Sequence, residues 1–174
     1  MTVKLIESPQ EADRTAVKQR ALVTMGKDAA NPPTDDWLRK ILRARHSPIR
    51  RLWFSFYLEI PSWVSVHLVR HVHAQPFVQS QRNDRQSAYD RNKAPQDAPV
   101  KMILDVNAEE LINIANKRLC AKAAAETREV VTEMCRLAAE AFPAIKDELV
   151  PVCVRNGHRC YEMDACGKYP SQNA

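Results

Sequence analysis

The distribution of apolar and polar positions along the chain predicts an alternation of strands and helices. Residues 2–6 alternate in character and predict a short strand. Residues 51–60 are rich in aromatic side chains and predict the most strongly marked strand. Helical spacing of apolar residues predicts helices from Pro9 to about Met25, from Thr34 or Asp35 to the break at His46–Pro48, from Pro61 to about Arg70, from Asn107 onward, and from Ala121 to Ala141.

Capping residues set the expected ends of these helices. Ser8, with Glu11 three residues later, is expected to cap the first helix, and Gly26 is expected to end it. Asn107 is expected to cap a later helix, where Glu110 completes a capping box. The capping role alone would explain Asn107, and it is compatible with a ligand contact.

The remaining segments predict loops and a single folded unit. Residues 75–81 are expected to be extended, with Phe77 as an apolar anchor, and the polar residues 83–99 are expected to form a mobile loop. We expect one domain over residues 1–150 and an irregular, cysteine-rich tail over residues 151–174.

Composition limits the class of protein. The 174 residues are 45% apolar, which is enough for a real core, and only three are glycine. No glycine-rich phosphate-binding or dinucleotide-binding motif occurs. No apolar run is long enough to span a bilayer and no signal peptide begins the chain, so we expect a cytoplasmic protein with no membrane partner.

A basic segment at residues 70–82 is the most informative stretch. It gathers arginine, histidine and glutamine directly after an apolar run at residues 63–69. Hydrogen-bonding and cationic side chains next to a buried element are suited to an anionic ligand, and the net charge of +5 agrees with a phosphate-bearing partner. The alternative is a helix end whose arginines are simply solvated.

The tail contains four side chains of types that bind zinc: Cys153, His158, Cys160 and Cys166. Their spacings are looser than those of paired zinc knuckles, and a chain without a secretory signal is expected to keep its thiols reduced. The favoured interpretation is therefore free thiols and no metal.

Two blocks of the sequence resemble the flavin-dependent thymidylate synthases. That family carries the motif Arg-His-Arg, seven residues, then Ser; here Arg70-His71-Val72 is followed by seven residues and Ser80, with Arg82 two positions further. The second family block, Val-Asn-Ala…Asn-x-x-Asn-x-Arg…Ala-x-x-Glu, is matched by Val106-Asn107-Ala108, Asn113, Asn116, Arg118, Ala123 and Glu126. The resemblance covers about residues 47–83 and 102–143.

The resemblance implies both a fold and an activity. The fold would be α/β (α+β), with a small antiparallel or mixed sheet packed against long helices. The reaction would be the reductive methylation of dUMP to dTMP, with FAD as cofactor and with methylene-tetrahydrofolate and NADPH as co-substrates. The enzyme would be a homotetramer with active sites shared between subunits, and nucleic acid would not be a partner.

The resemblance also implies roles for individual residues. The expected FAD contacts are Ser47, Arg70, His71, Val72, Asn107, Ala108, Glu109 and Asn113. The expected nucleotide contacts are His67, Arg70, Val78, Gln79, Ser80, Gln81, Arg82 and Arg118. Arg118 would act in catalysis, because a guanidinium that stays protonated can stabilise negative charge developing on the uracil ring. For His67, a core histidine with a satisfied hydrogen bond is the competing interpretation.

The chain departs from the family pattern at several positions. Val72 replaces an arginine, Phe77-Val78 replaces an Asn-Glu pair, and the segment after Arg82 is short and lacks a phosphate-binding arginine that Arg85 or Arg91 could replace. Two alternatives therefore stay open. The same scaffold could modify another pyrimidine nucleotide, or the protein could bind nucleotides or nucleic acid without catalysis.

Overall fold

The fold is built on a four-stranded antiparallel sheet with the strand order β1-β2-β4-β3. A computed structural model describes residues 1–85, 90 and 92–172. The strands are β1 (Thr2–Glu7), β2 (Trp53–Pro61), β3 (Ala74–Val78) and β4 (Pro99–Asn107). The strands expected at residues 2–6 and 51–60 are confirmed as β1 and β2.

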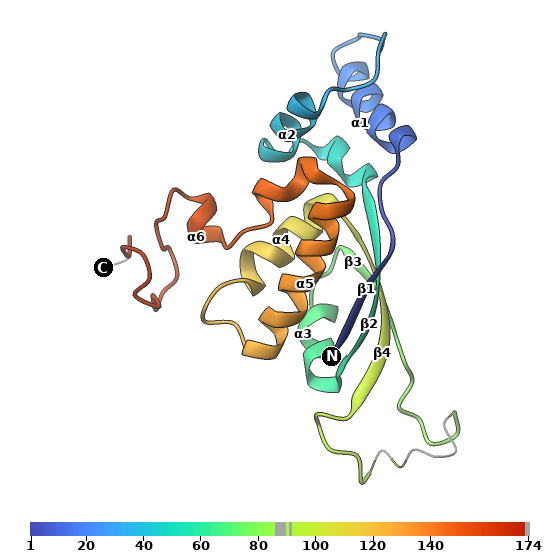
Figure 1. The fold of residues 1–174 in the computed structure, drawn as a ribbon, viewed down its shortest axis with the longest axis vertical. Helices are drawn as coiled ribbons and strands as arrows, with labels where there is room; N and C mark the ends of the chain where they lie inside the picture. The colour runs from blue at the N-terminus through green and yellow to red at the C-terminus, as the bar shows by residue number, and fades with distance from the viewer. Residues whose placement is uncertain (86–89, 91, 173–174) are drawn as a thin grey trace.

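Helices cover one face and one end of this sheet (Figure 1). They are α1 (Glu11–Val23), α2 (Asp35–Arg43), α3 (Ser62–Val69), α4 (Ala108–Arg118), α5 (Ala125–Ala141) and α6 (Val152–Arg155), with 3-10 helices η1 (Ser47–Arg51) and η2 (Pro143–Glu148). In Figure 1, α3, α4 and α5 lie on one side of the strands, while α1 and α2 lie at the upper end. The expected α+β architecture is confirmed.

Strand β4 is the main element that the sequence patterns do not predict. It lies between β2 and β3, and all of its residues pair with β2. Met102, Leu104 and Val106 are buried against the helices, whereas Lys101 and Ile103 are exposed on the other face. This alternation is that of a half-buried strand. Pro99, expected in the preceding loop, is its first residue.

Two expected helix ends are wrong. Helix α1 begins at Glu11 and is capped by Gln10 rather than Ser8, because the Gln10 backbone N–H donates to the Asp13 carboxylate at 2.9 Å. Helix α5 begins at Ala125 rather than Ala121, because the preceding residues form a turn. Gly26 does end the first helical segment, with a φ of 65° that favours glycine.

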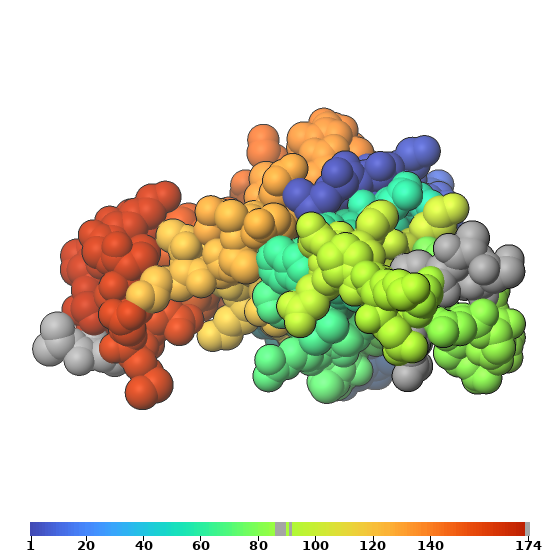
Figure 2. All heavy atoms as spheres, turned by 90° about the horizontal axis from the view of Figure 1, so that it is seen from below, coloured from blue at the N-terminus to red at the C-terminus, as the bar shows by residue number. Residues whose placement is uncertain are grey.

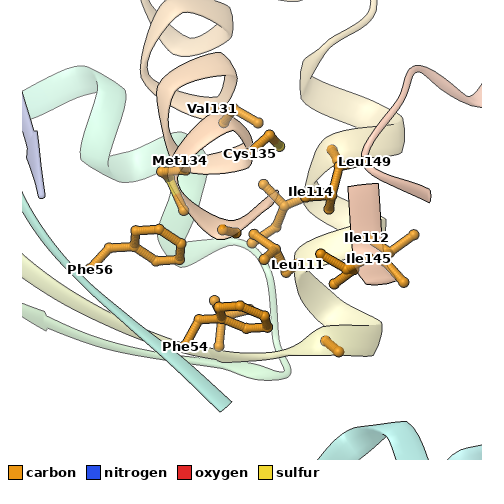
Figure 3. Packing of buried hydrophobic residues seen from close by; sticks show 14 of the residues in the cluster. Phe54, Phe56, Leu111, Ile112, Ile114, Val131, Met134, Cys135, Ile145 and Leu149 are labelled. Atoms are coloured by element: carbon orange, nitrogen blue, oxygen red, sulfur yellow. The ribbon is translucent and has the colours of Figure 1, made fainter. Parts of the chain in front are cut away.

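The core lies between the sheet and helices α4 and α5. Phe54 and Phe56 of β2 are buried and stacked, with ring centroids 6.5 Å apart, and Phe142 packs edge-on against Phe54 at 6.3 Å. Figure 3 shows both β2 rings facing the side chains of the two helices. Phe77, expected to be an anchor, is 60% exposed on the opposite face. The anchoring prediction is therefore wrong for the protomer.

The C-terminal tail projects from the body of the molecule (Figure 1). Apart from the short helix α6 and a bridge between Cys160 and Ser171, residues 151–172 are irregular, and Cys160 is the one buried residue among them. Part of the loop expected at residues 83–99, including Arg91, lies outside the described residues. No helix in the described ranges is long and apolar enough to cross a membrane.

Removal of one core ring should destabilise the protein strongly. Phe56→Ala should lower the free energy of unfolding by about 3–5 kcal/mol, because it leaves a cavity beneath α5. Urea unfolding followed by circular dichroism measures this change. Lys101→Ala, on the exposed face of the same sheet, should stay within about 0.5 kcal/mol of the wild type. Equal losses in the two variants would contradict the assignment of the faces.

Candidate functional site

The basic motif begins where α3 ends. Arg70 is the C-cap of α3, and the chain turns back at once, with the His71 N–H donating to Leu68 O at 3.1 Å and the Ala74 N–H donating to His71 O at 3.0 Å. This turn leads into β3 and directs the half-buried His71 side chain toward α4. The turn therefore brings the first sequence block against the second.

A hydrogen-bonded network joins the two blocks. His71 Nδ1 lies 3.1 Å from Glu110 Oε1, and Arg118 Nε donates to His71 Nε2 at 3.1 Å. The other carboxylate oxygen of Glu110 accepts from Asn113 Nδ2 at 3.2 Å. Two residues of the expected FAD set and the expected catalytic arginine are thus linked through Glu110, a residue to which the sequence analysis gives only a capping role.

These contacts define the state of His71. Burial lowers the pKa of His71, and the Arg118 guanidinium lowers it further, against an opposing effect of Glu110. A guanidinium nitrogen always donates, so Nε2 must be the acceptor and Nδ1 must carry the proton that it shares with Glu110. His71 is therefore neutral and holds Arg118 in one orientation.

Arg118 is the centre of positive charge. Its Nη2 donates to the His67 carbonyl at 3.0 Å, which fixes a second edge of the guanidinium. Burial lowers the pKa of Arg118 and the neighbouring Arg70 lowers it further, so two cations face the same region. Within the ranges that the structure describes, no carboxylate pairs with Arg70. This arrangement is suited to an anion.

Arg45 is a part of the network that the sequence analysis did not find. Its Nη1 donates to Asn113 at 2.8 Å and its Nη2 donates to Asn116 at 2.7 Å, while its buried Nε has no partner in the described residues. Its φ of 56° is uncommon for a side chain of this size. No local pattern identifies such a position, because the contacts come from a helix far along the chain.

Other expected FAD residues have structural roles. Asn107 is buried and its Oδ1 accepts from the Glu110 N–H at 3.0 Å, so its capping role is confirmed. The Ala108 N–H donates to Leu52 O at 2.8 Å, and Glu109 forms an ion pair with Arg50. Ser47, at the start of η1, and Val72 are exposed. FAD binding by these residues stays a prediction.

The expected nucleotide-binding segment is placed differently from the prediction. β3 ends at Val78 rather than extending to Gln81, and the Gln79 N–H donates to Lys101 O at 2.8 Å. Arg82 Nε donates to Asp84 Oδ1 at 2.9 Å, and Arg82 Nη2 donates to Asp84 Oδ2 at 2.6 Å. Ser80 Oγ accepts from the Arg82 N–H at 3.3 Å. The two donors therefore do not converge on a free site in the protomer, because a neighbouring carboxylate already holds the guanidinium.

The two groups of site residues lie at opposite ends of α3. Gln81 Nε2 donates to Ser62 Oγ at the start of the helix, at 3.1 Å, whereas Arg70 caps its end. Eight helical residues separate the groups by about 12 Å. The main cavities of the protomer are lined by other residues. Among the residues that the structure describes, none of these cavities holds both groups.

His67 supports the competing interpretation. Its Nδ1 lies 2.8 Å from Thr127 Oγ1, and its ring packs edge-on against Trp63 at 5.5 Å. These contacts satisfy a half-buried histidine without a ligand. Its backbone carbonyl, rather than its ring, contacts Arg118.

Comparison with known proteins agrees with the second block. Residues 90–144 match the family model described as thymidylate synthase complementing protein (Thy1). The resemblance indicated by the motifs is confirmed. The matched range is about a third of the chain and includes β4, α4 and α5, whereas the motif at residues 70–82 lies before it. A comparison with curated protein sequences gives no match.

A solved structure shares the fold of this chain. It is the crystal structure of PolB, a UMP/dUMP methylase from Streptomyces cacaoi bound with 5-Br dUMP. The TM-score is 0.67 at 17% sequence identity, and the match covers 84% of this chain and 93% of PolB. The arrangement of strands and helices is therefore that of a known enzyme scaffold.

The cysteine-rich tail does not form the ligand set suggested by sequence spacing. The His158 ring packs against Tyr169, with centroids 4.9 Å apart. Cys153, Cys160 and Cys166 are free thiols. Within the described ranges, no three His, Cys, Asp or Glu side chains are already arranged around a metal position.

The neutral state of His71 should make stability depend on pH. Its pKa is lower in the folded protein than its ordinary value of about 6.5, so the unfolded chain takes up the proton first as the pH falls. Its contribution should be complete above about pH 6.5 and should be lost as the pH falls through the lowered pKa of the folded state.

Urea unfolding at a series of pH values measures this effect. His71→Gln should remove the contribution, whereas His73→Gln, at an exposed position two residues away, should keep it. Parallel pH profiles for the wild type and His71→Gln would contradict the assignment.

Proposed function

We propose that the protein is a pyrimidine-nucleotide methylase that adds a one-carbon unit to the uracil ring of dUMP. The single observation that carries this proposal is the network from Glu110 through His71 to Arg118, which unites the two sequence blocks in one place. The Thy1 match and the fold shared with a UMP/dUMP methylase support it.

Arg118 would act on charge that develops in the ring. Hydrogen bonds from Nε to His71 and from Nη2 to the His67 carbonyl orient the guanidinium before the substrate binds. Little reorganisation would therefore be needed during the reaction. Arg70 beside it would add a second positive charge. Glu110 and His71 would act as positioning residues, because they contact Arg118 directly or through one neighbour.

FAD would bind at the exposed part of this region. Arg70 and Ser47 are exposed donors of the kind that bind phosphate groups, and the first turn of α4 lies next to η1, which carries Ser47. When bound, FAD would carry the hydride needed to reduce the transferred carbon to a methyl group, with methylene-tetrahydrofolate as the carbon source and NADPH as the reductant. Val72 supplies no charge here, so Arg70 would have the larger share of phosphate binding.

The complete site would require a second copy of the chain. The nucleotide segment and the Arg118 network lie at opposite ends of α3. In the part of the chain that the structure describes, neither group lines one of the main cavities. The outer face of the sheet exposes Trp53, Phe77 and Ile103. Burial of this apolar face in a homotetramer would allow one protomer to complete the site of another.

A related substrate is the second candidate. Phe77 and Val78 are exposed where a polar pair and its carboxylate are usual, so the pocket around the sugar or base would be more apolar. A dUMP with an apolar substituent is the alternative that this difference favours, and UMP is a further alternative because PolB is described as a UMP/dUMP methylase. No specific observation favours a purely nucleic-acid-binding role.

The deciding experiment uses the full chain. Purified protein reconstituted with FAD should show a flavin spectrum that changes on addition of dUMP, and tritium release from 5-³H-dUMP should require a folate carbon donor and NADPH. A response to UMP alone would select the second candidate. If the protein binds neither FAD nor any nucleotide at low salt, the proposal is overturned.

Arg118→Ala should lower turnover more than nucleotide affinity. Loss of a donor that stabilises developing charge typically lowers kcat by about 100–1,000-fold, whereas dUMP affinity should change only a few-fold. Steady-state kinetics and equilibrium dUMP binding measure the two effects. Arg136→Ala removes the same charge from the α5 surface, where Arg136 pairs with Glu133 and Glu140, and should change neither. Equal losses in turnover and affinity would contradict the catalytic role.

Substitutions of Arg82 and Asp84 should change dUMP affinity in opposite directions. Arg82→Ala should weaken dUMP binding by about tenfold or more while FAD stays bound, because a charge-assisted phosphate contact is lost. Asp84→Asn should tighten binding by up to about fivefold, since it removes the carboxylate that competes for Arg82. Calorimetric titration measures both, and unchanged affinity in both variants would show that Arg82 does not bind the phosphate.

A further inference from the structure

Four thiols from two distant parts of the chain surround one cavity. The cavity has a volume of about 320 Å³ and lies between the α4–α5 connection and the C-terminal tail. Cys120, Cys153, Cys160 and Cys166 all line it. Figure 2 shows the tail as a separate lobe beside the α4–α5 region. The fifth cysteine, Cys135, is buried in the core and does not line this cavity.

The backbone explains how the tail cysteines reach the cavity. Cys153 lies in α6, and the positive φ values of Gly157 (68°) and His158 (63°) turn the chain back so that the Arg159 N–H donates to Cys153 O at 3.1 Å. Cys160 is then held by a bridge to Ser171. The turn therefore brings Cys160 back toward Cys153, and both residues line the cavity.

The tail has almost no hydrophobic core. Between residues 151 and 172, only Cys160 is buried, and the one helix has four residues. A segment of this size buries too little apolar surface to offset the loss of chain entropy, and small units of this kind are usually held by disulfides or metal ions. Its thiols are free, so a ligand that joins them would add stability to the tail.

The surroundings of the thiols suit a cationic metal bound by thiolates. Four thiolates around Zn²⁺ carry a net charge of −2. Arg128 and Lys168 line the same cavity and would balance that charge, with Glu162 as the opposing group. Lys122 also lines the cavity but is paired with Asp164.

We propose that Cys120, Cys153, Cys160 and Cys166 bind one Zn²⁺ ion in a tetrahedral structural site. Each thiol loses its proton to solvent and forms one Zn–S bond, four protons are released in total, and no group is oxidised or reduced. The site is not preformed, because no three ligands are yet arranged around one point in the described residues. Binding therefore draws the exposed Cys166 segment inward until the Zn–S distances reach about 2.3 Å.

This ligand set differs from the one that sequence spacing suggests. His158 is replaced by Cys120, which follows Arg118 by two residues at the end of α4. A metal at this position would join the tail to the helix that carries Arg118. The proposal does not depend on the proposed methylase activity.

Metal titration of the full chain tests the proposal. Protein purified under reducing conditions and stripped with a chelator should bind one equivalent of Zn²⁺, or of Co²⁺ with the thiolate charge-transfer band and strong visible bands of a tetrahedral thiolate site. In the wild type, Zn²⁺ should protect Cys120, Cys153, Cys160 and Cys166 from alkylation, as mapped by mass spectrometry, so the assignment does not depend on whether a variant folds.

Matched variants separate the possible ligand sets. Cys120→Ser and Cys166→Ser should each weaken Zn²⁺ binding by about 100-fold or more, since even outer partners of a metal site change affinity by about 10–100-fold. Cys135→Ala and His158→Asn should keep wild-type affinity.

Three results would overturn the proposal. The first is the absence of stoichiometric Zn²⁺ binding by the reduced chain. The second is loss of binding in His158→Asn with retention in Cys120→Ser. The third is the isolation of stable disulfides among these cysteines from protein that binds no Zn²⁺.

Discussion

The buried carboxylate of Glu110 is the interaction on which the arrangement of the site depends. Its side chain is 5% exposed and divides its two oxygens between His71 and Asn113. A carboxylate at this depth is tolerated only when hydrogen bonds replace its lost hydration. The turn after α3 and the first turns of α4 must therefore keep the positions that satisfy it. The orientation of Arg118 follows from this constraint.

Much of this arrangement could be predicted from local sequence. The capping role of Asn107 depends on one side chain and a backbone N–H three residues away, so its residue type and position were sufficient. The pairing of the two motif blocks was predicted from resemblance, and the structure brings Arg70, Asn113 and Arg118 into one region. Strand β2 was identified from its aromatic residues, because its inner face is fully buried.

The failures share a different cause. β4 follows a polar segment and begins with a proline, so its alternation was masked by the residues before it. Arg45 acquires its partners from α4, at positions 68 and 71 residues away in sequence. Ser80 and Arg82 were both expected to contact the nucleotide, but Asp84 competes for the Arg82 guanidinium. Long-range contacts and local ionic competition leave no periodic signal in the sequence.

The guanidinium of Arg45 spans two asparagines that stand three residues apart on α4. Residues with this spacing lie on one side of a helix. The planar guanidinium can therefore donate to both side chains at only one angle of rotation of the helix about its axis. Rotation of α4 by a single residue, about 100°, would carry both amides away together. Arg45 thus fixes the rotation of α4 about its axis. Because Arg118 follows Asn116 by two residues on the same helix, Arg45 also fixes the direction in which the Arg118 side chain points, although Arg45 is not part of that helix.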